Sequence, residues 1–312
     1  MAAVPKKILL AVDGSVHSRS MLDYVAHILP HLPALTCCLL HVQSGLSPML
    51  VEEAERDPKT KAQLESVVRR NEAHGRRVLD HSREVLQRHG LAFEAIETTT
   101  QPRIIGLARD IIMRAEAAPY DAIVVGRRGV SGLQKLFMGS LTAKLCEHSE
   151  IVPVWVVDGD RPQDGFLLAV DGSQNAMRAL DHMAFMLTGS RTAHVTLVHV
   201  ASRPVDHSEI DLNNDEEELE TVLTLTGQQV LDRFVAAAKS RLVQAGLDPD
   251  RIEFRQVKRN AGTGRAILDL ARRRGLGTVV IGRRGSGGAF YSGRVCRYVM
   301  EKSARRTFWL VP

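Results

Sequence analysis

Several signals that identify common classes of protein are missing from this sequence. Aromatic residues make up only 4% of the chain, which leaves few side chains that can stack on nucleobases. The four cysteines show no CxxC or CxxH spacing and therefore indicate neither a disulfide framework nor a zinc site. The longest apolar runs, such as residues 8–12, fall far short of the roughly 18 residues that a membrane span needs. We therefore expect no membrane association.

The net charge of +5 favours anionic partners, yet its distribution argues against nucleic acid. Paired arginines are spread over the whole chain instead of forming one basic face, and an acidic stretch runs from Asp206 to Glu220. The amino terminus leads into a short apolar segment without the extended apolar region or the cleavage site of a secretory signal. We expect a cytoplasmic protein that does not bind nucleic acid.

Motifs for common nucleotide chemistry and for nucleophilic catalysis are also absent. The sequence contains no Walker GxxxxGK[ST] loop, no GxGxxG fingerprint and no GxSxG elbow. The SGGxDS loop of ATP pyrophosphatases belongs directly after the first strand, where this chain has the segment Val12 to Ser15. No pair of a nucleophile and a base is visible. We therefore expect a protein that is not an enzyme.

What the sequence does contain is a repeat of about half its length. The segment Ala11 to Ser15 recurs letter for letter as Ala169 to Ser173, and Val124 to Gly129 returns with one conservative change as residues 280–285. The units of solenoid proteins are about 20 to 50 residues long, so this much longer period indicates a duplicated globular domain. We expect two domains, residues 1–158 and residues 159–312, each of common domain size.

Short apolar runs alternate with longer, helix-like segments in both halves. The continuous apolar run over residues 7–12, followed by a turn, is typical of a buried parallel strand. Strands that alternate with helices predict a parallel sheet with helices on both faces. The predicted fold class is α/β, with two tandem doubly wound five-stranded parallel-sheet domains of the Rossmann-like type.

The pattern also predicts the position of each strand. Residues 44–58 are expected to form a loop that leads into a long helix over residues 59–88. The expected strands cover residues 7–12, 35–42, 92–98, 122–126 and 152–157 in the first half, and residues 166–170, 194–200, 252–257, 278–281 and 307–311 in the second. Ligands of open parallel sheets bind beyond the carboxyl ends of the strands, where the strand order reverses.

The strongest local signal follows the fourth expected strand. Gly126 and Gly129 flank two arginines, and after nine further residues Gly139 and Ser140 open a helix. Glycines let the backbone approach a ligand closely, and the first N–H groups of a helix have no partner within it. A phosphate group fits such a site, with Arg128 adding positive charge from the rim. The alternative is an ordinary surface turn in which Ser140 caps the helix.

The order of three motifs resembles the universal stress protein family. The motifs are Ala11 to Ser15 at the first strand, Leu40 to Val42 at the second strand, and the loop spacing GxxG, nine residues, Gly-Ser. The resemblance covers both halves of the chain. It implies a tandem universal stress protein whose first half binds ATP with Mg2+ held by the nucleotide, so that no metal ligands are needed from the protein.

The resemblance also implies which residues contact the nucleotide. Val12 and Asp13 would meet the base or ribose, and Val42 would line the adenine pocket. For Asp13, this role is compatible with a second one as a turn-former before the next helix. The residues implied at the ribose and the phosphates are Gly126, Arg128, Gly129, Gly139, Ser140, Leu141 and Thr142.

The second half keeps part of this pattern and departs from it at the loop. Gly285 and Gly293 are separated by only seven residues, and Arg294 stands where the first half has Ser140. The shorter loop moves the helix start away from a ligand docked as in the first half, and the long cationic side chain either fills the phosphate position or binds a different anion. We expect a degenerate second site. Its candidate residues are Asp171, Val200, Gly282, Arg284, Gly285 and Arg294.

The sequence therefore predicts a stress-response regulatory protein that binds ATP, or a related adenine nucleotide, mainly in its amino-terminal domain, with at most slow hydrolysis. Two alternatives stay open: a nucleotide-free interaction scaffold, and a different ligand in the carboxy-terminal domain. The family pairs its domains through their last strands, which implies an intramolecular pairing of residues 154–157 with residues 308–311. A further homodimer and an unknown protein partner are open as well.

Overall fold

The computed structural model of the chain describes residues 4–127, 138–159, 163–201, 216–258, 262–283, 293–303 and 305–312. The chain divides into two compact units. One unit contains Pro5–Leu29 and Ala34–Pro162, and the other contains Gln163–Pro312 together with Met1–Val4 and Pro30–Pro33. The predicted domain limits, residues 1–158 and 159–312, remain a prediction.

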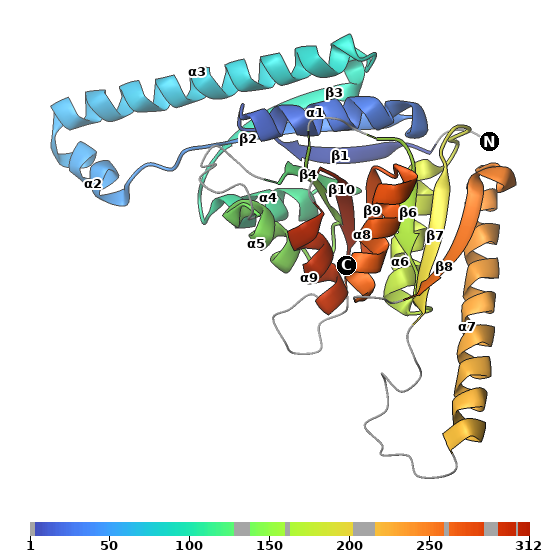
Figure 1. Ribbon diagram of the computed structural model, residues 1–312. Coiled ribbons are helices and arrows are strands. Elements are labelled where there is room, and N and C mark those ends of the chain that lie inside the picture. Colours follow the sequence, from blue (N-terminus) through green and yellow to red (C-terminus); the bar gives the residue numbers. More distant parts are fainter. Residues whose placement is uncertain are drawn as a thin grey trace. The chain divides into compact units, whose positions relative to one another are not determined.

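The amino-terminal unit alternates strands and helices along the chain (Figure 1). Its strands are β1 (Lys6–Ala11), β2 (Leu35–Gln43), β3 (Ile96–Pro102), β4 (Ala122–Gly126) and β5 (Val154–Val157), and its helices are α1 (Val16–Ile28), α2 (Pro48–Arg56), α3 (Pro58–Arg88), α4 (Leu107–Glu116) and α5 (Ser140–His148). All strand pairs in this unit are parallel, in the order β3-β2-β1-β4-β5. The order reverses between β1 and β4, which places a ligand crevice at the carboxyl ends of these two strands.

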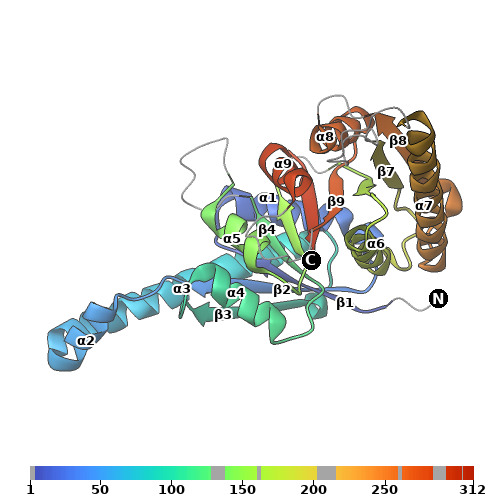
Figure 2. The same cartoon turned by 90° about the horizontal axis from the view of Figure 1, so that it is seen from below.

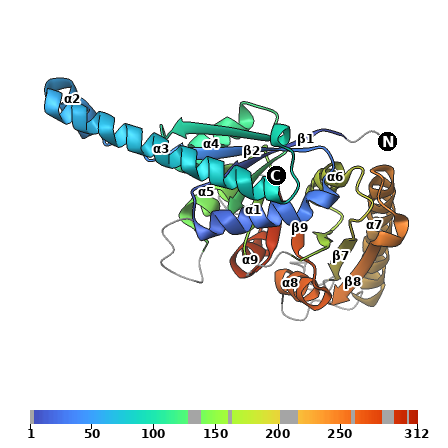
Figure 3. The same cartoon turned by 90° about the horizontal axis from the view of Figure 1, so that it is seen from above.

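Helices cover both faces of this sheet. Helix α1 packs beside α3 on one face (Figure 3), and α4 packs beside α5 on the other (Figure 2). The middle of β1 is the run Ile8, Leu9 and Leu10, and none of these side chains is exposed to solvent. A strand between two helical layers has no polar face, which explains why its sequence is continuously apolar rather than alternating.

The carboxy-terminal unit repeats this architecture. Its strands are β6 (Phe166–Ala169), β7 (Val195–Ala201), β8 (Ile252–Lys258), β9 (Thr278–Gly282) and β10 (Thr307–Val311), and its helices are α6 (Gln174–Leu187), α7 (Glu216–Gln244), α8 (Thr263–Arg274) and α9 (Arg294–Lys302). Its parallel strands lie in the order β10-β9-β6-β7-β8, which is the order of the first unit under renumbering. Both units thus confirm the predicted fold class of two doubly wound five-stranded parallel sheets.

Two expectations about local structure are wrong. The segment expected as a loop over residues 44–58 contains α2, which begins after Ser47 with Pro48 in its first turn and buries Ala54. Proline is favoured there because its missing N–H would have no helical partner. The strand expected at residues 92–98 begins only at Ile96, because a short 3-10 turn, Phe93–Ala95, precedes it.

The termini of α3 follow the sequence closely. Asp57 caps the helix by accepting hydrogen bonds from the backbone N–H groups of Lys59 and Thr60, at 3.3 and 2.8 Å. The helix ends at Arg88, and Gly90 follows with a positive φ of 95°. Among the described residues, no helix has both the length and the apolar composition that crossing a bilayer requires.

Candidate functional site

The turn after β1 begins the candidate site. Oδ1 of Asp13 accepts a hydrogen bond from the backbone N–H of Ser15 at 2.9 Å, and Gly14 between them has a φ of 76°. The hydroxyl oxygen of Ser15 then accepts from the N–H of Ser18 and caps α1. The structure confirms that Asp13 forms a turn before the next helix. This turn uses only one carboxylate oxygen, at the carboxyl end of the sheet.

A buried histidine on β2 holds the end of β1. Nδ1 of His41 lies 2.9 Å from the carbonyl oxygen of Val12, and because a carbonyl only accepts, Nδ1 carries the proton. Helix α3 passes directly over this ring at Gly75, where a Cβ atom would lie only 2.8 Å from Cδ2 of His41. The adjacent His74 ring packs edge-on against His41, with centroids 5.8 Å apart. Sequence analysis did not assign a role to His41.

The register of the sheet brings two predicted site residues, Val12 and Gly126, to one edge together with His41. Leu10 pairs with Val124 on β4 and with Leu39 on β2, so the following residues Val12, Gly126 and His41 end up at the same level. Val12 is almost completely buried, and its backbone N–H donates to the carbonyl oxygen of Leu40 at 2.9 Å. Val42 is partly exposed beside it. These strand ends therefore share one edge of the sheet, and the ligand crevice expected there stays a prediction.

The loop after β4 is closed at its base. The N–H of Gly139 donates to the carbonyl oxygen of Arg127 at 2.9 Å, and Oγ1 of Thr142 donates to the carbonyl oxygen of Gly126 at 2.9 Å. These two bonds hold the start of α5 against the end of β4. The predicted site residues Arg128 and Gly129 lie outside the described residues.

Gly126 is needed for the close approach of α1 to β4. A Cβ atom at this position would lie 2.7 Å from the backbone oxygen of His17, which is closer than nonbonded atoms tolerate. The glycine therefore serves the packing of the strand end against the first turn of α1. This reason differs from the close approach to a ligand that the sequence pattern indicated.

Among the residues that the structure describes, no side chain caps the first turn of α5. Gly139 is the N-cap residue and provides no side-chain oxygen, and the hydroxyl of Thr142 is engaged with β4. Ser140 is exposed and Leu141 is partly exposed. By contrast, α1 is capped by the Ser15 hydroxyl. Uncapped N–H groups at a helix start form a site for an anion.

A buried ion pair stabilises the start of the loop that follows β4. Nη1 of Arg127 donates to Oδ2 of Asp158 at 3.2 Å, and the two side chains are 3% and 12% exposed. The backbone N–H of Arg127 also donates to the carbonyl oxygen of Val157, the last residue of β5. The start of the loop is thus tied to the residue that follows the last strand of the same unit. Asp158 was not expected to have this role.

The carboxy-terminal unit repeats the turn and the histidine contact. Oδ1 of Asp171 accepts from the N–H of Ser173 at 3.0 Å, and Nδ1 of His199 lies 3.0 Å from the carbonyl oxygen of Val170. A Cβ atom on Gly282 would lie 2.3 Å from the backbone oxygen of Asn175. The strand-end geometry of the first unit therefore recurs in the second.

The second unit differs where its last helix begins. Arg294 is exposed in the first position of α9, and a buried cysteine, Cys296, replaces the threonine that binds the strand end in the first unit. Val200 is buried, whereas its counterpart Val42 is partly exposed. The candidates Arg284 and Gly285 lie outside the described residues. The two units are therefore alike in the turn after their first strand and in the histidine contact, and they differ at the start of the last helix and in the exposure of the valine that follows the histidine.

These features define a tandem pair of doubly wound α/β domains with a glycine-flanked loop leading to a helix start. The universal stress protein family model matches the sequence twice, over residues 5–158 and residues 165–305. The chain therefore belongs to the universal stress protein family, with two family domains in tandem.

Individual relatives agree with this assignment. The chain is 27% identical over 291 residues to a universal stress protein of Mycolicibacterium smegmatis, covering 90% of this chain and 88% of the relative. It is 29% identical over 162 residues to universal stress protein YxiE of Bacillus subtilis, covering 48% of this chain and 97% of the relative. A crystal structure of a universal stress protein from Archaeoglobus fulgidus shares the fold, with a TM-score of 0.63, 20% identity, and coverage of 98% and 97% of the two chains.

Proposed function

We propose that this stress-response protein binds ATP, or a related adenine nucleotide, at the carboxyl edge of its amino-terminal sheet. It acts as a module that responds to a ligand rather than as a fast enzyme. The proposal rests on the family assignment and on one observation in particular: the uncapped start of α5 is held beside the end of β4 by Thr142 and Gly139. A negatively charged phosphate tail suits the helix N–H groups at that point.

The base and ribose side of the proposed site lies at the ends of β1 and β2. We assign three groups to it: the backbone of Val12, the carboxylate oxygen of Asp13 that the turn does not use, and the side chain of Val42. His41 orients the Val12 carbonyl from the buried side, so that the peptide that follows faces the crevice in a defined direction. Such preorganisation reduces the ordering that a ligand must impose on binding.

The phosphate side is assigned to the loop and to α5. Gly126 ends the strand next to the ribose, while Ser140, Leu141 and Thr142 present backbone N–H groups. Gly139, whose own N–H is bonded to the Arg127 carbonyl, is the N-cap residue and adds no side chain there. Thr142 contributes through its backbone, because its hydroxyl proton is already bonded to Gly126. Arg128 and Gly129 complete the proposed site from residues that the structure does not describe.

The residues present suit Mg2+ that arrives with the nucleotide. In the part of the chain that the structure describes, no three His, Cys, Asp or Glu side chains gather in a way that could hold a metal ion. Mg2+ often keeps several waters and takes phosphate oxygens as ligands, so it does not require such a cluster. The proposed cofactor is therefore MgATP, with its cation supplied and held by the nucleotide.

The second unit is proposed to be a degenerate site. Asp171, Val200 and Gly282 keep the base side, whereas the arginine at the start of α9 changes the phosphate side. Arg284 and Arg294 would supply positive charge, and the loop that begins at Gly285 is two residues shorter than its counterpart in the first unit. A short cationic site of this kind suits a smaller anion better than a triphosphate. We therefore expect one nucleotide per chain under conditions that saturate the first site.

Calorimetry on the full chain tests the proposal. The variant Gly139→Val with Ser140→Val blocks the proposed phosphate site, and Gly293→Val with Arg294→Val makes the matched change in the second unit. Both glycines have an ordinary φ, −61° and −51°, so valine does not strain the backbone there. We expect one MgATP per chain, more than about tenfold weaker binding in the first variant, and unchanged binding in the second.

Other outcomes identify the competing functions. If the wild-type chain binds no adenine nucleotide and MgATP does not raise its Tm, the protein is a nucleotide-free scaffold, because a ligand of the folded state must stabilise it by mass action. If both variants lose binding equally, the second site is not degenerate. ATP turnover near the enzyme median of about 10 per second would contradict the assignment as a binding module.

A further inference from the structure

Helix α3 continues well past the sheet that it covers. The helix has 31 residues, yet its buried residues all lie in the carboxy-terminal half: Gly75, Val78, Leu79, Ser82, Val85 and Leu86. The amino-terminal half and α2 extend away from the sheet of their own unit (Figures 1 and 3). The carboxy-terminal half of α3 buries one face against its own unit. In the amino-terminal half, α2 covers the continuation of that face.

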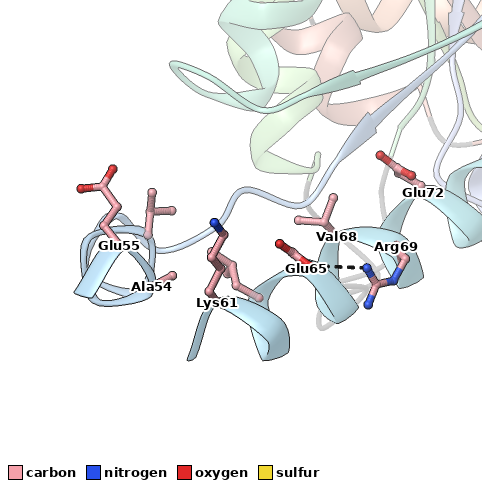
Figure 4. A pocket seen from close by; sticks show the side chains of 9 residues that line it. Ala54, Glu55, Lys61, Glu65, Val68, Arg69 and Glu72 are labelled. Atoms are coloured by element: carbon pink, nitrogen blue, oxygen red, sulfur yellow. Dashed lines mark ion pairs between the residues drawn. The ribbon is translucent and has the colours of Figure 1, made fainter. Parts of the chain in front are cut away.

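An open groove follows this face. It has a volume of about 460 Å3 and lies between α2 and the amino-terminal half of α3 (Figure 4). Its lining residues are Val51, Ala54, Glu55, Lys61, Leu64, Glu65, Val68, Arg69 and Glu72. Three of its apolar lining residues are accessible to solvent: Val51 is 40% exposed, and Leu64 and Val68 are partly exposed. Exposed apolar side chains gathered in one groove are typical of an interaction site.

The charges along the groove have a self-complementary order. From the amino-terminal end of α3, the charged lining residues alternate as Lys61, Glu65, Arg69 and Glu72. Reversing this order exchanges every sign. In an antiparallel pair of identical helices, Lys61 of one copy therefore faces Glu72 of the other, and Glu65 faces Arg69. Such a pattern is what a two-fold symmetric interface requires, because each contact then occurs twice.

We propose that a second copy of this chain docks on the groove, with the two α3 helices antiparallel and the two-fold axis near Val67. Leu64, Val68 and the exposed residues of α2 supply the apolar area that drives association. The exposed charges add little affinity each, but they set the register and the antiparallel direction. The intrachain pair of Glu65 with Arg69, at 3.7 Å, is exposed and can share its partners with the second copy.

The experiment uses two complementary charge reversals in the full chain. Lys61→Glu alone places like charges opposite each other twice in a dimer, and so does Glu72→Lys alone. We expect each variant to weaken the dimer by about tenfold or more in sedimentation velocity over a range of protein concentration. Mixing the two variants restores both pairs, so we expect a heterodimer with nearly wild-type affinity.

Restoration in the mixture can only arise between chains. Lys61 and Glu72 are eleven positions apart on one helix, which is about 16 Å of rise, so they do not contact each other within one chain. Arg70→Glu serves as the matched control. It makes the same change of charge on α3, but Arg70 does not line the groove, so we expect an unaltered dimer.

Two results would overturn the proposal. One is a wild-type chain that stays monomeric at every concentration, which would leave the groove to a different partner. The other is a dimer that the single reversals leave intact, or that mixing fails to restore, since either would place the interface elsewhere. Helix content from circular dichroism confirms that each variant is folded, because all three substituted side chains lie at the surface or partly exposed.

Discussion

The hydroxyl of Thr142 donates a hydrogen bond to the carbonyl oxygen of Gly126, with 2.9 Å between the two oxygens. This bond joins the start of α5 to the end of β4 across the loop that is assigned to the phosphates. Thr142 is 2% exposed, so the bond is shielded from water. Without this bond, the start of α5 should move relative to β4. The side chains that face the ligand would all be unchanged.

Replacing this threonine tests the role of the bond. We expect Thr142→Val to weaken MgATP binding about fivefold, the equivalent of one lost hydrogen bond of about 1 kcal/mol. Thr142→Ser keeps the hydroxyl and should stay within about twofold of wild type. Calorimetric titration of both variants measures the difference. Equal losses in the two variants would contradict the role of the hydrogen bond, because Thr142→Ser keeps the hydroxyl.

Gly126→Ala should destabilise the amino-terminal unit. The added Cβ would lie 2.7 Å from the backbone oxygen of His17, and backbone cannot rotate away as a side chain can. We expect a loss of about 1 to 3 kcal/mol in urea unfolding, typical of overpacking. Gly106→Ala is the control, because its Cβ meets no atom within 4 Å and its extended backbone suits any residue. A control that is equally destabilised would contradict the steric explanation.

The ion pair of Arg127 with Asp158 should show strong coupling. Asp158→Leu leaves a buried guanidinium without this carboxylate, and we expect a cost of about 3 to 5 kcal/mol. Arg127→Met combined with Asp158→Leu removes both charges and should be less destabilised than the single variant. A double-mutant cycle in denaturant measures the coupling energy. Additive effects would mean that the two side chains act independently.

The stability of the carboxy-terminal unit should fall in mild acid because of His182. Burial lowers the pKa of this imidazole to about 3, and its ring packs edge-on against Trp309 at 5.7 Å. The unfolded chain binds a proton near pH 6.5 while the folded chain does not, so stability is full above that pH and is lost as the pH falls toward 3.

The variant His182→Gln isolates this contribution. Between pH 7 and pH 5, we expect the wild type to lose about 2 kcal/mol more unfolding free energy than the variant, as the ordinary histidine pKa predicts. Urea unfolding at both pH values gives the comparison. Parallel losses in the two proteins would show that carboxylates or other histidines cause the acid sensitivity.

Much of the fold followed from the sequence. The continuous apolar runs correctly predicted β1 and β4, and the limits expected for β10 agree with the structure. Their pattern is clear because strands buried on both faces contain few polar residues. Asp13 comes directly after the first of these runs, so its position at a strand end was predictable. Parallel strands bring their carboxyl ends to one edge of the sheet.

The errors occurred where local patterns depend on a distant neighbour. Helix α2 has only nine residues, and its contact with α3 explains why Ala54 is buried. β3 lies at the edge of the sheet and contains a run of three threonines, so its sequence carries little of the apolar pattern that defines a central strand. Its true start at Ile96 is set by pairing with Cys37 on β2.

The sequence by itself determined the duplication and the parallel α/β fold, and it led to the proposed location of the site, because repeats, apolar periodicity and strand-end motifs are local properties of the chain. Only the tertiary structure decided how His41, Thr142 and Asp158 support that site. Each of these side chains bonds a residue between 16 and 31 positions away. Such contacts depend on the register of the sheet and on burial, which residue order does not reveal.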